Sequence, residues 1–217
     1  MWVAEARQPA PACAILAGAM TAVYDPKGDL QRRLQRSRDI LLWKLEGLTE
    51  YDTRRPMVPT GTNLLGLVKH MTFVEAGYFG DSFGRPVPGI SFDEVEETNA
   101  DMWAQPDESR DYIVNRYRTV WEHADATISE HALDAPARVP WWPEDRRDTN
   151  LHYILVHVLD EIARHAGHAD IVRELIDGKA GVRAESLNLP EESPEWWASY
   201  RERVEQAARQ AGAVGRT

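Results

Sequence analysis

The sequence predicts an all-α fold: an up-and-down four-helix bundle with an additional C-terminal helix. Two observations predict it. Four long segments place apolar residues three, four and seven positions apart, which is the pattern of a helix with one buried face. No segment alternates for long between apolar and polar residues, as a half-buried strand would. The elements expected from these patterns follow in chain order.

The first two predicted helices are separated by a stretch rich in helix-breaking residues. The first runs from about residue 29 to 49, because five leucines share one of its faces. These leucines are Leu30, Leu34, Leu41, Leu45 and Leu48. The stretch YDTRRPMVPTGTN then breaks the helix with two prolines and a glycine. Thr62 or Asn63 can cap the second helix, whose buried side extends to Phe79.

The third predicted helix and the loop after it follow a second break. The motif FGRPVPG ends the second helix, and SFDE at Ser91 resembles a capping box for a short helical piece. The third helix starts near Pro106, a favoured first position for proline, and continues to about Leu133. The loop DAPARVPWWPEDRRDTN is long for a helix connection, and long ordered loops often carry function. Trp141 and Trp142 lie at its centre.

The last two predicted helices have clear boundary signals. The fourth spans about residues 150–176, and Gly178 is expected to stop it. The fifth begins with Ser193 as its cap and Pro194 in the first helical position. We expect Arg173 of the fourth helix to be exposed, because it lies off the apolar stripe.

Length and composition favour one helical domain. The chain has 217 residues, of which 43% are hydrophobic and 28% charged, and this is ordinary globular composition. We expect residues 1–24 to form a disordered N-terminal extension and residues 25–217 to form the domain. The apolar run ACAILAGAM in the extension is too short to cross a bilayer and makes only a weak signal peptide.

Charge and cysteine content limit the partners and the compartment. A formal net charge of -10 argues against a nucleic-acid or anionic-membrane surface, because such partners need a basic footprint. The single cysteine, Cys13, excludes a disulfide within the chain and favours a reducing compartment, so we expect a cytoplasmic protein. Because Cys13 lies in the predicted extension, any thiol chemistry would need a thiol from outside the chain.

Titratable residues lie along the side of the fourth helix that should be buried. In EIARHAGH, His165 lies about 40° round the helix from Glu161, and His168 lies about 20° the other way. On the second helix, His70 falls between Leu67 and Val74 and also points into the bundle. Two imidazoles and a carboxylate are the ligands of many catalytic zinc sites, so these residues predict a divalent metal site. The same ligands also suit nickel or iron.

Each of these observations has a simpler alternative. A single histidine on an apolar face, such as His70, is more often a hydrogen-bonded core residue than a ligand. A glutamate four residues before a histidine is common on helices and can be a surface pair. His157 and His168 are expected to lie around the metal rather than to bind it. The pair Trp141 and Trp142 can be either core packing or the wall of a pocket.

The stretches NLLGLVKHMTFVEAGYF and ILVHVLDEIARHAGHADIVREL resemble the DinB-like superfamily, and most closely its actinobacterial branch of unknown function. The resemblance covers about residues 27–210 and implies a four-helix bundle, a divalent metal and often a dimer. His70 and His165 match two of the usual histidine ligands. Glu161 replaces the third histidine, as in the related mycothiol-dependent maleylpyruvate isomerase, a zinc enzyme. This departure bears on which metal is bound.

The resemblance and the residues together predict a metal-dependent thiol S-transferase or isomerase. Its thiol would be mycothiol, its second substrate a small electrophile, and its metal zinc, with nickel or iron as alternatives. Trp141 and Trp142 are the expected substrate-binding residues, and His168 is the expected catalytic residue. Two other functions are weighed against it. One is a non-catalytic, stress-linked metal-binding bundle, and the other is a metal-dependent hydrolase with His168 or Asp160 as its base.

Overall fold

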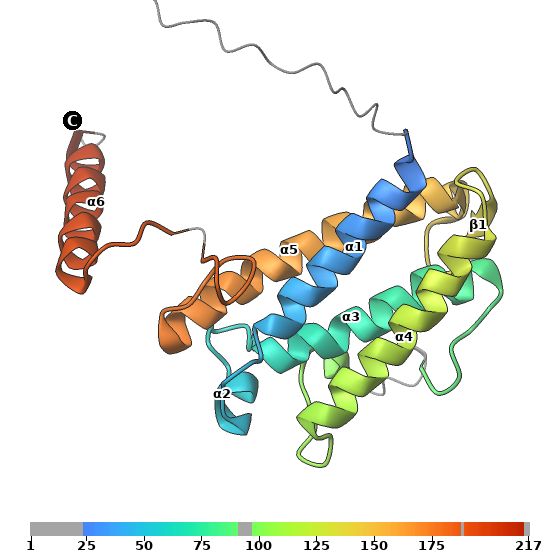
Figure 1. The fold of residues 1–217 in the computed structure, drawn as a ribbon, viewed down its shortest axis with the longest axis horizontal. Coiled ribbons are helices and arrows are strands. Elements are labelled where there is room, and N and C mark those ends of the chain that lie inside the picture. The colour runs from blue at the N-terminus through green and yellow to red at the C-terminus, as the bar shows by residue number, and fades with distance from the viewer. Residues whose placement is uncertain (1–23, 91–96, 188, 215–217) are drawn as a thin grey trace, which may run out of the picture.

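The computed structural model describes residues 24–90, 97–187 and 189–214. In these residues, four long helices form a bundle: α1 (Pro26–Trp43), α3 (Leu64–Phe79), α4 (Arg110–Glu130) and α5 (Leu151–Asp177). Around the bundle, α1 packs on α5, α5 on α3, and α3 on α4 (Figure 1). The predicted all-α bundle with a C-terminal helix is confirmed. The predicted extension, apart from its last residue, and the SFDE motif lie outside the described residues.

The helix directions differ from strict up-and-down alternation, because α3 and α4 run parallel to each other. Ion pairs join their starts, Lys69 to Glu108, and their far ends, Arg85 to Glu130. The described parts of the connection between them, residues 80–90 and 97–109, therefore lie toward opposite ends of the bundle (Figure 1). These described parts contain the short 3-10 helices η1 (Asp81–Phe83) and η3 (Ala100–Met102). An amphipathic pattern shows which face is buried but not the direction of a helix.

Capping side chains mark the starts of the α-helices. The Asn63 side chain accepts a hydrogen bond from the Gly66 amide and so begins α3, as predicted. Gly178 ends α5 with φ +77°, in the left-handed conformation that favours glycine. The predicted start of the third helix at Pro106 is wrong. Ser109 caps α4 instead, accepting a hydrogen bond from the Tyr112 amide, and Pro106 lies in the preceding turn.

Two segments contain structure that the periodicity does not show. The first predicted helix is interrupted: α1 ends at Trp43, a turn with Gly47 at φ +72° follows, and α2 (Glu50–Arg54) is a separate short helix. The long loop before α5 folds as a hairpin. In it β1 (Pro136–Arg138) pairs antiparallel with β2 (Asp148–Asn150), and η4 (Glu144–Arg146) lies between them.

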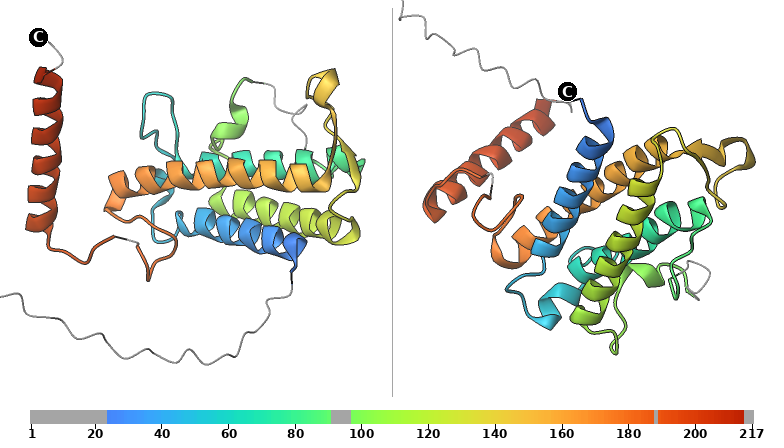
Figure 2. Two further views of the ribbon diagram at one scale, coloured as in Figure 1. Left: turned by 90° about the horizontal axis from the view of Figure 1, so that it is seen from above. Right: turned by 45° about the vertical axis from the view of Figure 1, so that its right-hand side comes forward.

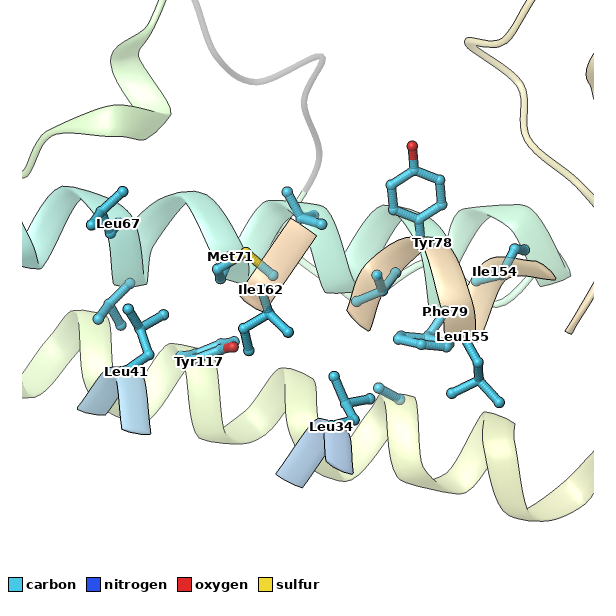
Figure 3. Close-up of a cluster of buried hydrophobic side chains, with 14 of the residues drawn as sticks. Leu34, Leu41, Leu67, Met71, Tyr78, Phe79, Tyr117, Ile154, Leu155 and Ile162 are labelled. Carbon is cyan, nitrogen blue, oxygen red and sulfur yellow. The ribbon is translucent and has the colours of Figure 1, made fainter. Parts of the chain in front are cut away.

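The core consists of the apolar stripes of the four long helices (Figure 3). Its fully buried side chains include Leu34 and Leu41 of α1, Met71 and Phe79 of α3, and Ile154, Leu155 and Ile162 of α5. Burial of such side chains is the main favourable contribution to folding. The core therefore holds α3 and α5 in the register that positions the candidate site.

A charged network crosses the core beside these apolar residues. Arg38 and Glu75 are each 0% exposed, and their side chains form an ion pair with an Nη2–Oε2 distance of 2.6 Å. Asp125 accepts a second hydrogen bond from Arg38, at 3.0 Å. The Tyr117 hydroxyl donates to Glu75 at 2.7 Å. Burial, together with the Glu75 carboxylate, raises the pKa of Tyr117, so this hydroxyl keeps its proton.

The predicted exposure of Arg173 is wrong, because this side chain is 1% exposed. Its guanidinium donates to the carbonyl oxygens of Lys44 and Glu46, both at 2.8 Å, and pairs with Asp177. These two carbonyls lie just beyond the last turn of α1, where helical partners are missing. Arg173 thus ties the end of α1 to α5, a role that a helical pattern does not reveal.

The predicted fifth helix is present as α6 (Pro194–Val214). The Ser193 hydroxyl accepts a hydrogen bond from the Trp196 amide at its start, as predicted. The helix stands away from the bundle (Figure 2). No helix in the described part of the chain has the length and apolar character needed to cross a membrane.

Candidate metal centre

Three predicted ligands converge between α3 and α5. His70 comes from α3, and Glu161 and His165 come from adjacent turns of α5. One ligand atom from each residue lies within 4.8 Å of the others. The His165 Nε2 atom is 3.6 Å from a Glu161 oxygen, and the two imidazole rings meet edge to face at 4.8 Å. The donor set of two nitrogens and one carboxylate fits a divalent zinc, nickel or iron ion.

Asp101 orients His70 from outside the cluster. A carboxylate oxygen of Asp101 lies 2.6 Å from the His70 Nδ1 atom. The hydrogen bond from His70 lowers the pKa of Asp101, although burial opposes this shift. Asp101 therefore stays ionised, and its carboxylate accepts a hydrogen bond from the His70 Nδ1–H group. Nε2 of His70 then presents its lone pair. Carboxylates commonly hold metal-binding histidines in this way.

Sequence reasoning missed Asp101, and no local signal marks it. Asp101 lies in η3, which precedes the start of α4 and packs on α3. It is separated from His70 by 31 residues. The packing of η3 on α3 brings the carboxylate to the histidine.

His165 is kept in the neutral form that a metal requires. Its residue is 9% exposed, and burial lowers its pKa to about 4, with smaller contributions from His70 and His168. An imidazole must lose its proton to bind a metal, so His165 is ready to bind at neutral pH. The His168 Nδ1 atom approaches His165 Nδ1 at 3.4 Å. His168 itself is exposed and is not one of the three clustered residues.

The shifted pKa of His165 predicts a pH-dependent stability of the metal-free protein. Unfolded, His165 takes up a proton near pH 6.5, whereas folded it does so near pH 4. The free energy of unfolding should therefore fall by about 3 kcal/mol as the pH drops through this window. Urea unfolding of chelated protein at several pH values measures the slope. The variant His165→Gln, which does not titrate, should show a shallower slope, and equal slopes would contradict the prediction.

Hydrogen bonds link His157, Tyr78 and Trp142 one helical turn along α5 from the cluster. The His157 Nε2 atom is 2.8 Å from the Tyr78 hydroxyl oxygen, which also accepts a hydrogen bond from the Trp142 indole at 3.1 Å. Burial raises the pKa of Tyr78, and the hydrogen bond from Trp142 acts in the opposite sense. His157 precedes Glu161 by four residues, so the two side chains lie on the same face of α5. The group formed by His157, Tyr78 and Trp142 is therefore next to the cluster along this face.

The two predicted substrate-binding tryptophans lie at this border. Trp141 packs on Gly77 of α3, where a Cβ atom would approach its indole ring to 2.8 Å. The rings of Trp141 and Tyr78 meet edge to face at 5.2 Å. Trp142 lies on the wall of a hollow of about 470 Å³ between the hairpin and the first turns of α5. Their role in binding substrate stays a prediction.

Comparison with known families identifies the group to which the chain belongs. A family model described as Mycothiol-S-transferase matches residues 29–178. This range includes all but the first residues of α1, the whole of α3, α4 and α5, and the three clustered side chains. A comparison with curated proteins gives no match. The resemblance to the DinB-like superfamily is confirmed, and the chain belongs to the mycothiol S-transferase family.

Proposed function

We propose that the protein is a metal-dependent mycothiol S-transferase in which His70, Glu161 and His165 hold a divalent ion, most simply zinc. The observation that carries this proposal is the convergence of three donor side chains from two helices within 4.8 Å. The family match supports the thiol and the type of transfer. The described residues include no cysteine, so the sulfur would come from the cofactor.

The side chains around the ion would each have a distinct part in the reaction. A bound divalent ion would lower the pKa of the mycothiol thiol, so that the thiolate forms near neutral pH. Asp101 holds His70 in the required tautomer, and burial keeps His165 unprotonated. His168, exposed beside His165, is proposed to take the thiol proton and pass it to solvent.

The electrophile is proposed to enter beside Trp141 and Trp142. Its reactive carbon would form a bond to the thiolate sulfur. In a substitution the leaving group would depart with the electron pair of the broken bond, and in an addition to an α,β-unsaturated carbonyl compound the electron pair of the π bond would move to the α-carbon, which then takes up a proton. Trp141, which is 45% exposed, offers an apolar surface at this entrance. The large rings suit a small apolar electrophile.

The test is a thiol-transfer assay on metal-loaded and chelated protein. Mycothiol is combined with a panel of electrophiles that includes an activated aryl chloride, an α,β-unsaturated carbonyl compound and an alkyl iodide. Transfer above the chelated control is expected for at least one class. If no class reacts faster than this control, the proposal fails. Metal-dependent turnover of ester or amide substrates without thiol would instead favour the hydrolase.

A further inference from the structure

The hollow beside the metal cluster has the size and position of a ligand site. It lies between η4, β2 and the first turns of α5, and its volume is about 470 Å³. Sites for small organic ligands usually fall in the range of about 300–1,000 Å³. His157 forms part of its wall and precedes Glu161 by one helical turn, a rise of about 5.4 Å. The wall of the hollow at His157 therefore lies one helical turn from Glu161, the nearest of the clustered residues along α5.

Three polar side chains in the wall have unused hydrogen-bonding capacity. Within the described residues, the side chains of Asp145, Arg146 and Thr149 make no hydrogen bond or ion pair, although all three line the hollow. The carboxylate accepts hydrogen bonds, the guanidinium donates them, and the hydroxyl does both. The wall carries charges of both signs, so it does not select a simple anion or cation. Its groups match a neutral ligand that has several donors and acceptors.

Two aromatic rings complete the wall. Tyr153 is 56% exposed and meets Trp142 edge to face at 5.8 Å. The Trp142 indole nitrogen already donates a hydrogen bond to Tyr78. A ligand in the hollow would therefore contact the ring surface of Trp142 rather than its N–H group. Aromatic surface next to carboxylate, guanidinium and hydroxyl groups suits a saturated ring that carries hydroxyl groups, because such a ring has both apolar C–H faces and polar edges.

We propose that this hollow binds the hydroxyl-rich part of the thiol cofactor while the thiol itself reaches His70, Glu161 and His165. The inference rests on the proposed function, since mycothiol carries its cysteine on an amino sugar joined to inositol. Asp145 and Tyr153 are the central contacts: Asp145 accepts hydrogen bonds from hydroxyl groups, and the exposed ring of Tyr153 covers one face of a sugar ring.

A ligand without a thiol tests the hollow separately from the metal. The probe is N-acetylglucosaminyl-inositol, in which an acetyl group replaces the acylated cysteine of mycothiol and keeps the sugar nitrogen a neutral amide, titrated into the full chain by calorimetry. We expect saturable binding that is the same in metal-loaded and chelated protein. Asp145→Asn and Tyr153→Ala should each weaken it about tenfold. Glu144→Gln, an exposed residue of the same 3-10 helix that does not line the hollow, is the matched control and should bind normally.

The outcomes separate this inference from the proposed function. Absence of saturable binding, or equal affinity in Asp145→Asn, Tyr153→Ala and the unaltered protein, overturns the sugar site even if thiol transfer is observed. Binding that needs Asp145 and Tyr153 supports the site even if no electrophile reacts. Both residues are exposed, and circular dichroism of each variant confirms that the fold is retained.

Discussion

Glu75→Ala is expected to lower the free energy of unfolding by about 3–5 kcal/mol, the usual effect of removing one partner of a buried ion pair. Arg38, which is 0% exposed, would keep only its bonds to Asp125 and Gln35. The Tyr117 hydroxyl would lose its acceptor inside the core. Urea unfolding at neutral pH, followed by circular dichroism, measures the change.

Two further variants show whether the loss comes from the unpaired charge. Glu122→Ala changes an exposed glutamate of α4 and should shift stability by no more than about 0.5 kcal/mol. The double substitution Arg38→Met with Glu75→Leu removes both charges and should recover much of the stability lost in Glu75→Ala. A loss below about 1 kcal/mol in Glu75→Ala would show that water or rearrangement compensates the buried charge, against this prediction.

His70→Ala is expected to yield protein without its bound metal and without metal-dependent thiol transfer. The change removes the one proposed ligand that comes from α3, which leaves two ligands on a single helix. Two ligands are fewer than the three protein ligands typical of catalytic zinc sites. Metal content is measured by mass spectrometry on protein purified without added metal. Unchanged content in His70→Ala would contradict the proposed site.

Two further variants distinguish loss of a metal ligand from loss of the carboxylate that orients it. Asp101→Asn should keep the metal but weaken its binding about 10–100-fold, because His70 loses the charge that holds its ring. His152→Ala changes an exposed histidine at the start of α5 and should leave metal content unaltered. Equal affinity in Asp101→Asn and the unaltered protein would show that this carboxylate has no such role.

Local patterns were enough to predict the parts of the molecule that depend on near neighbours in the chain. Asn63 and Gly178 bound α3 and α5 as expected, because capping involves residues within one turn. The same periodicity put His70 on one buried face and Glu161 with His165 on another. The convergence of these residues follows once two such faces pack together, and the structure shows it.

The patterns failed where a residue's environment comes from distant parts of the chain. Arg173 lies off the apolar stripe of α5, yet carbonyl groups just after α1 cover its guanidinium. Arg38 and Glu75 are charged and give no sign in the sequence that they meet inside the core. A charged side chain is normally exposed unless a partner is present, and these partners come from other helices.

Residue types and their spacing along the chain accounted for the class of fold, the start of α3 at Asn63, the end of α5 at Gly178 and the helix faces that carry His70, Glu161 and His165, because each depends on residues within a few turns. Helix direction, the approach of Asp101 to His70 and the hollow beside Tyr153 depend on how the connections cross the bundle. Periodicity records which side of a helix is apolar, but it carries no information about which distant segment packs there. Those features therefore arise from packing over the whole chain.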